Sequence, residues 1–203
     1  MTLRRMLARL LGASVVVISA GCGAPAAAAP PAPASPAPAS PAPAPPEAET
    51  MGRLTDLVVE RITLADVVAA AKFGTPDPID DPAREQQVLD EVAAAAPGAG
   101  VEPAEATRFF RDQIEANKVV QRGLYQRWTA EPDLRPAQAP DLAAEVRPRL
   151  DRLTTALLGG LRDAAGVRIP AASCDLAAGR TDLDALHRTA LKVALRSVCA
   201  PPE

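Results

Sequence analysis

Beyond Glu47, apolar side chains recur every three or four residues, and this spacing strongly limits what the chain can fold into. The clearest case is the segment 103–130, where one helical stripe carries Phe110, Ile114, Leu124 and Trp128. Such a period is typical of an amphipathic α-helix. Similar stripes predict four more helices, at residues 54–72, 82–96, 143–165 and 182–199. No segment alternates apolar and polar residues long enough to indicate a strand, so the sequence predicts an all-α domain.

The N-terminal residues have a different character and predict export. Residues 1–22 join a basic start to a short apolar stretch and small residues before Cys22, as a signal peptide does. The ending S-A-G-C resembles a lipobox, which predicts a lipid on Cys22 and attachment to a membrane; the alternative is a plain secretory signal. Residues 23–48 are mostly Ala, Pro and Ser, and predict an extended tether. Residues 49–203 then form one domain of a periplasmic or cell-surface lipoprotein, or otherwise of a secreted protein.

Charge and composition exclude several classes of function. A formal net charge of −3 and an aromatic content of 2% lack the basic, ring-bearing surface that nucleic-acid binding needs. With a single histidine and two cysteines that are expected to pair, we expect no zinc, iron or haem site. Cys174 and Cys199 predict a disulfide in an exported chain. Closing a loop of about 25 residues would contribute on the order of 3 kcal/mol in the chain-entropy model.

Polar side chains interrupt the predicted helices at positions that should face inward or begin a helix. They are Asn117 and Gln121 in 103–130, Arg61 and Lys72 in 54–72, Arg147 in 143–165, and Asp81, Arg84 and Glu85 at the start of 82–96. Any one of them can extend to water or bond to a neighbouring helix. Together they would be costly to bury unless an anionic molecule lay among them. Because arginine binds carboxylates bidentately, the pattern predicts a dicarboxylate pocket inside a helical bundle.

Three stretches of the sequence belong together: AKFGTPDPIDDPAREQQVLDEV, FFRDQIEANKVVQRGL and PDLAAEVRPRLDRLTTALL. They resemble the exported, all-helical chorismate mutases of the AroQ gamma class. The likeness covers about residues 52–200, and Cys174 and Cys199 are similar to the disulfide of that class. The resemblance implies the Claisen rearrangement of chorismate, which carries two carboxylates, to prephenate, with no cofactor.

The resemblance also implies a role for each inward polar residue. Arg61 and Arg147 would hold the substrate carboxylates, and Asn117 would assist one of them. Lys72 and Gln121 would donate hydrogen bonds to the ether oxygen. Arg84 and Glu85 would contact the ring hydroxyl and the adjoining carboxylate, with Asp81 as their neighbour. Because Arg147 belongs to the same chain, activity need not require a dimer, and a homodimer stays open. Some members have Glu in place of Gln121, and a carboxyl must be protonated, and so needs acidic pH, to donate a hydrogen bond there. Since an amide donates at any pH, we expect Gln121 to remove that requirement.

Two other functions stay open at this point. One is a non-catalytic helical lipoprotein that binds a small dicarboxylate, and the other is a structural helical protein whose inward charges pair with each other. No expected site position has an apolar residue, which favours an active enzyme. His187 and Trp128 are interpreted as structural, and Phe73, where the class often has Trp, as a packing residue.

Overall fold

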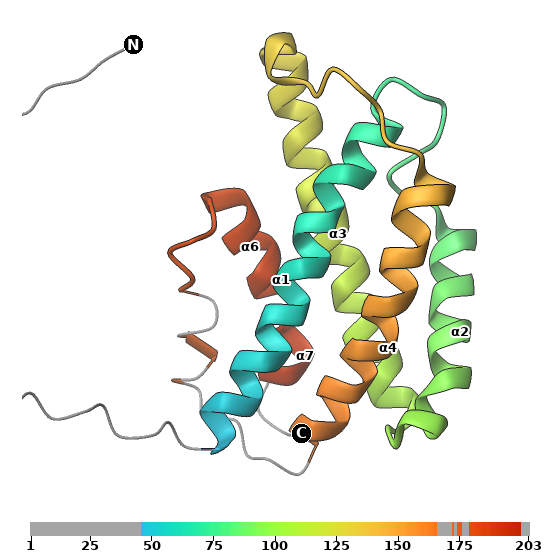
Figure 1. The fold of residues 1–203 in the computed structure, drawn as a ribbon, viewed down its shortest axis with the longest axis vertical. Coiled ribbons are helices and arrows are strands. Elements are labelled where there is room, and N and C mark those ends of the chain that lie inside the picture. The colour runs from blue at the N-terminus through green and yellow to red at the C-terminus, as the bar shows by residue number, and fades with distance from the viewer. Residues whose placement is uncertain (1–45, 166–171, 173, 176–178, 200–203) are drawn as a thin grey trace, which may run out of the picture. The chain divides into compact units, whose positions relative to one another are not determined.

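The computed structural model describes residues 46–165, 172, 174–175 and 179–199, and these residues contain helices and no strand (Figure 1). The elements are α1 (Pro46–Lys72), α2 (Pro82–Ala99), α3 (Pro103–Ala130), η1 (Pro132–Leu134), η2 (Leu142–Val146), α4 (Arg147–Ala164), α6 (Ala185–Ala194) and α7 (Arg196–Cys199). The predicted all-α fold is confirmed. The predictions for the signal peptide, Cys22 and most of the tether lie outside the described residues. Within the described part of the chain, no helix is both long and apolar enough for a membrane span.

Helix α3 organises the bundle because it packs against α1, α2 and α6, while α1 also packs against α4. Figure 1 shows α2 at one edge of the bundle and α6 at the other. The largest fully buried side chains come from several helices and include Leu54, Ile62, Phe109, Phe110, Leu157 and Leu191. Each such side chain stabilises the fold by about 1.5–3 kcal/mol relative to an exposed one. These buried side chains hold together the helices that line the pocket described below.

The observed ends of α1 and α2 differ from the predicted ones. Helix α1 begins at Pro46, eight residues before Leu54 and inside the predicted tether. A proline at the first position and acidic side chains in the first turn favour a helix start there. Helix α2 was expected to end before Pro97, but it continues to Ala99. Its actual stop is Gly100, whose φ of 76° and backbone bond to the Pro97 carbonyl form a left-handed cap.

The predicted helix 182–199 is wrong as one element, because it is divided into α6 and α7 around Leu195. Two side chains of α3 bond to backbone groups at this break. Gln113 Nε2 donates to the Ala194 carbonyl at 2.8 Å, and Asp112 Oδ2 accepts from Ser197 N at 2.8 Å. The predicted disulfide between Cys174 and Cys199 is confirmed, with Cα atoms 5.9 Å apart. These contacts fix the C-terminal helices to α3.

Candidate active site

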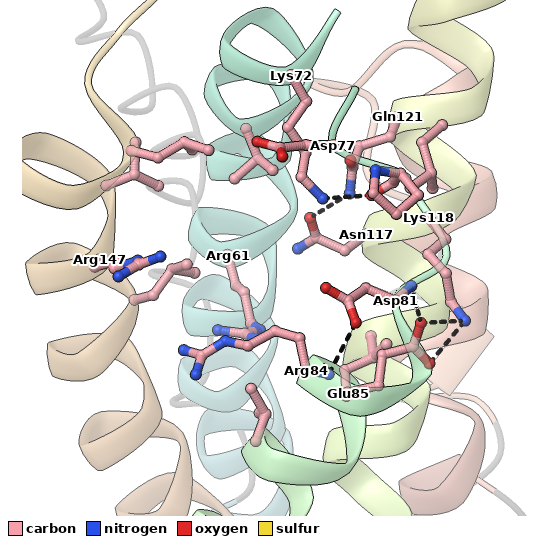
Figure 2. A pocket seen from close by; sticks show the side chains of 18 residues that line it. Arg61, Lys72, Asp77, Asp81, Arg84, Glu85, Asn117, Lys118, Gln121 and Arg147 are labelled. Atoms are coloured by element: carbon pink, nitrogen blue, oxygen red, sulfur yellow. Dashed lines mark hydrogen bonds and ion pairs between the residues drawn. The ribbon is translucent and has the colours of Figure 1, made fainter. Parts of the chain in front are cut away.

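A pocket of about 370 Å³ lies among α1, α2, α3, η2, α4 and the loop 73–81 (Figure 2). All eight inward polar residues named from the sequence line it: Arg61, Lys72, Asp81, Arg84, Glu85, Asn117, Gln121 and Arg147. Apolar side chains, among them Val68, Val88 and Ile114, complete the wall. The structure thus brings together residues from four segments that are well separated in the sequence.

Arg61 lies buried in the α1 wall, where it is 7% exposed. Its Nε and Nη1 atoms have no hydrogen-bond partner among the described residues, and its Cζ lies 5.8 Å from the centre of the Phe110 ring. Burial lowers the pKa of Arg61 to about 10, so the guanidinium is still charged at neutral pH. A buried, unpaired cation is costly in the empty protein, and an anionic ligand would offset this cost.

Lys72 lies in the last turn of α1, at the opposite end of the pocket wall from Arg61. The chain turns directly after it, because Gly74 adopts a φ of 82°, which glycine tolerates best. The loop then returns over the lysine, and Lys72 Nζ donates to the Pro78 carbonyl at 2.6 Å. An ammonium has three donors. This single bond to the described chain leaves two donors for a ligand.

Asn117 and Gln121 come from α3 and point with Lys72 into the same part of the pocket (Figure 2). Gln121 is 5% exposed, and its Nε2 approaches Asn117 Oδ1 at 3.5 Å, which is long for a hydrogen bond. Gln121 Oε1 has no partner among the described residues. The amide is therefore buried with most of its bonding capacity unused, as expected of a group that binds a ligand.

Two acidic residues of the site lie at the start of α2. Asp81 is the N-cap of α2, and its Oδ1 accepts from Arg84 N at 3.0 Å. In return, Glu85 Oε1 accepts from Asp81 N at 3.3 Å. With Pro82 at the first helical position, these bonds fix the start of α2. The Asp81 carboxylate thus has a structural task, while the Arg84 side chain remains exposed at the pocket edge.

Arg147 lies at the pocket rim and is exposed, whereas the stripe in 143–165 predicted that it would face inward. The difference arises from η2, a π-helical turn that directly precedes it. Asp141 caps this turn by accepting from Ala143 N and Ala144 N at 2.8 and 3.0 Å. Bonds from the Ala144 and Ala143 backbone lower the pKa of Asp141. The cap holds Arg147 at the mouth of the pocket.

Two charged residues of the pocket were missed in the sequence. Asp77 is in the loop 73–81, and Lys118 is in α3 beside Asn117 but off the apolar stripe. Lys118 bonds to Glu85, which is 33 residues away in the chain. No local spacing could have indicated that pair, because only the packing of α2 on α3 brings the two together.

The pocket is suited to holding an anion and stabilising charge. Among the described residues that line it there is no Ser, Cys or His, and its polar groups are cations, amides and three carboxylates. Donors fixed beside an apolar wall act more strongly than they would in water. Fold and site together define a helical protein whose pocket is suited to binding an anionic substrate and to stabilising charge on it.

Known proteins are similar to this chain in sequence and in fold. Residues 52–122 match the model of the chorismate mutase type II family. The secreted chorismate mutase of Mycolicibacterium smegmatis is 32% identical over 160 residues, which cover 75% of this chain and 88% of the relative. That of Mycobacterium tuberculosis is 30% identical over 157 residues, covering 73% and 78%. The crystal structure of a chorismate mutase from Burkholderia phymatum superposes with a TM-score of 0.69 at 31% identity, covering 76% of this chain and 99% of that one.

The chain therefore belongs to the chorismate mutase family, and it is an isomerase that converts chorismate to prephenate. The family and activity predicted from the sequence are confirmed. The roles of individual pocket residues stay predictions and are developed next.

Proposed function

We propose that the pocket described above binds chorismate as a dianion and rearranges it to prephenate, using side chains of a single chain. The observation that carries this proposal is Arg61, a buried cation without a partner among the described residues. It lines the same pocket as Lys72 and Gln121, whose donors are largely unused. A substrate with two carboxylates supplies a negatively charged partner for the Arg61 guanidinium.

The two substrate carboxylates are held by Arg61 and Arg147. Arg61 is fixed by burial and offers a guanidinium in place before the substrate arrives. Arg147 is exposed at the rim, so it completes the grip as the substrate enters. Asn117 assists a carboxylate from α3. Guanidinium groups suit this task because their planar fork matches a carboxylate.

The remaining binding residues act on the ring of the substrate. Arg84 and Glu85 lie at the ring hydroxyl and the adjoining carboxylate, and Asp81 orders the helix turn that carries them. The hydroxyl donates to the Glu85 carboxylate, while Arg84 contributes positive charge at the exposed edge of the pocket. This placement gives the ring one defined orientation relative to Lys72.

The chemistry needs orientation and charge stabilisation. The enolpyruvyl arm must fold over the ring, and holding it there removes much of the entropic barrier. As the C–O bond breaks and the new C–C bond forms, negative charge builds on the ether oxygen. Lys72 and the amide N–H of Gln121 donate to that oxygen more strongly in the transition state than in the ground state. No proton leaves the substrate, so no general base takes part.

Export and membrane attachment form the second part of the proposal. The similar mycobacterial proteins are named as secreted, which supports export of this chain. The sequence before Cys22 further supports cleavage and lipid attachment there. The mass of the mature N-terminal peptide tests this: a diacylated Cys22 is expected, and an unmodified N-terminus would contradict lipidation.

All the proposed site residues come from one chain, so a dimer is not required.

The site is tested by chorismate depletion, with prephenate identified as the product, in the purified exported chain and its Arg61→Ala variant. We expect Arg61→Ala to lose at least about a hundredfold in kcat/KM, because a buried partner of the carboxylate is removed. Arg53→Ala is the matched control, since Arg53 lies exposed on the same helix and pairs with Glu49 at 2.7 Å. Equal kinetics in Arg61→Ala and Arg53→Ala would place the site elsewhere.

A further inference from the structure

We infer that Lys118 is a positioning residue of this enzyme: it neutralises and orients the Glu85 carboxylate, so that an acidic side chain can line a pocket for a dianion. The inference rests on the proposed function, in which Glu85 accepts from the ring hydroxyl. Lys118 acts through Glu85 and has no part in binding the substrate carboxylates or the ether oxygen. It was not among the residues that the sequence indicated.

The contacts of Lys118 are unusually acidic for a residue that is 8% exposed. Its Nζ lies 3.1 and 3.0 Å from the two carboxylate oxygens of Glu85, and 2.6 Å from Glu115 Oε1. An oxygen of a third carboxylate, Asp80 Oδ1, is 3.5 Å away. Burial lowers the pKa of Lys118, but its hydrogen bonds to Glu115 and Glu85 raise it more, and the net direction is upward. The ammonium therefore stays charged.

The Lys118 side chain points in a different direction from those of Asn117 and Gln121, the other polar residues of α3 that line the pocket. Figure 2 shows Asn117 and Gln121 pointing to Lys72, while the Lys118 side chain extends to Glu85 on α2. Its donors are taken by carboxylates of the protein, in contrast to Arg61, whose Nε and Nη1 have no partner within the described part of the chain. Of these two buried cations, Arg61 is placed to receive the substrate and Lys118 to balance a charge of the protein.

Glu85 needs such a partner for two reasons. A free carboxylate in the wall would repel a dianionic substrate, and Lys118 cancels that repulsion at short range. A carboxylate also has about four acceptor positions, and a hydroxyl must find one of them. The Asp81 N–H and Lys118 occupy both positions of Oε1, and Lys118 occupies one of Oε2. One position on Oε2 remains for the ring hydroxyl, with the carboxylate held in a single orientation.

The chain offers a matched control one helical turn further along α3. Arg122 donates to Asp80 at 2.6 and 2.8 Å, which also joins α3 to the loop before α2. It is exposed and does not line the pocket. Its bond to Asp80 lowers the pKa of that carboxyl, so Asp80 already has a cation of its own. Arg122→Gln therefore breaks a similar pair, while Lys118, which also lies 3.5 Å from Asp80 Oδ1, keeps its bonds to both oxygens of Glu85.

The test compares steady-state kinetics of the full exported chain with those of Lys118→Met, Lys118→Arg, Glu85→Gln, the Lys118→Met/Glu85→Gln double variant and Arg122→Gln. In Lys118→Met, KM should rise about tenfold while kcat changes less than about threefold, because the uncompensated charge repels ground state and transition state alike. Lys118→Arg should recover most of the loss. In the Glu85→Gln background, Lys118→Met should change KM less than about threefold, and Arg122→Gln should resemble wild type.

Several results would overturn the inference. One is an unchanged KM in a folded Lys118→Met enzyme; another is a tenfold rise that persists in the Glu85→Gln background, since the effect would then not act through Glu85. If Lys118→Met does not fold, Lys118→Gln, which keeps a donor and removes the charge, is judged by the same numbers. Failure of the proposed function looks different: it would appear as normal turnover in Arg61→Ala, whatever Lys118 does.

Discussion

Two buried glutamines of α3, Gln113 and Gln121, show how the two faces of one helix serve different ends. Gln113 is 1% exposed and faces α6, where its Nε2 donates to the Ala194 carbonyl at 2.8 Å. Gln121 is 5% exposed and faces the pocket, where the one partner of its Nε2 among the described residues is Asn117 Oδ1, at 3.5 Å. Neither Oε1 atom has a partner among the described residues, so the two amides differ in their donors: that of Gln113 bonds to the protein, and that of Gln121 is left for the substrate. The partner of the donor group, and not burial, separates a structural amide from a functional one.

The same contrast extends to the rest of both faces. On the α6 face, Asp112 bonds to Ser197 N, and Gly123 lies so close to α6 that an added Cβ would meet Leu186 Cδ1 at 2.5 Å. On the pocket side, Arg61 of α1 has no hydrogen-bond partner for Nε and Nη1 among the described residues. Substitutions on the α6 face should therefore change stability and leave catalysis intact, while substitutions in the pocket should do the reverse.

The largest effect is expected at Lys72, on the pocket side. Lys72→Ala should lower kcat/KM by at least about a hundredfold, near 3 kcal/mol, because it removes a donor to the charge that develops on the ether oxygen. The unfolding temperature should change little, since Lys72 has one bond in the described chain, to the Pro78 carbonyl. Lys192→Ala, at an exposed position of α6, is the control. An Lys72→Ala enzyme within tenfold of wild type would refute the contact with the ether oxygen.

The paired substitutions Gln121→Leu and Gln113→Leu test the comparison directly. Gln121→Leu should cost about a hundredfold in kcat through loss of a donor, with the free energy of unfolding equal to that of wild type or higher. Gln113→Leu should cost about 2 kcal/mol of stability, because the buried Ala194 carbonyl loses its donor, and should leave kcat within twofold. Kinetics and urea unfolding measure both quantities. If both variants lost activity alike, the two faces would not be separable.

The features of the fold and the pocket that could be predicted from the sequence are those that depend on residues close together in the chain. The bounds of α3 and the inward places of Arg61 and Gln121 depend on helical spacing alone, and the structure has them as predicted. The end of α2 was wrong because Pro97 was interpreted as a stop, although the left-handed cap forms at Gly100. The spacing of apolar residues was therefore enough to predict which side chains of a regular helix face inward.

Features that depend on two distant segments could not be predicted. The break at Leu195 is stabilised by side chains of α3, and Lys118 finds Glu85 only once α2 packs on α3. Arg147 is at the rim because a π-turn precedes it, and periodicity assumes a regular helix. In each case a tertiary contact or an irregular turn overrides the pattern of the single segment.

A smaller effect on stability is expected from His187, which joins α6 to α1. Its ring nitrogens lie 2.9 Å from Asp66 Oδ1 and 2.7 Å from Asp184 Oδ1. The hydrogen bond to Asp66, followed by that to Asp184, raises the pKa of His187 to about 9. A raised pKa means that the stabilisation is complete below the unfolded value of about 6.5 and is lost as the pH rises through about 9. Because both carboxylates are partly exposed, solvent screens these ion pairs, and the expected stabilisation is about 1 kcal/mol.

The measurement for His187 is the free energy of unfolding of wild type and of His187→Gln between pH 6 and 9.5. The chain has one histidine, so the difference between the two curves isolates this residue. Wild type should be more stable by about 1 kcal/mol at pH 6, and the advantage should vanish near pH 9.5. A constant difference across this range would mean that the stabilisation does not depend on the charge of the ring. Activity at pH 7 should be equal in both, because His187 lies outside the pocket.

The smallest expected effect is the response of the wild-type reaction to pH, and it sharpens the contrast at Gln121. An amide donates its N–H at any pH, so kcat/KM should change less than about threefold between pH 5 and 8. In Gln121→Glu the donor exists only while the carboxyl is protonated, so activity should fall steeply as the pH rises. The ratio of wild type to Gln121→Glu should therefore grow at least about tenfold over this range. A wild-type rate that collapsed between pH 5 and 8 would show that another titrating group controls the ether oxygen, and the amide would lose its assigned role.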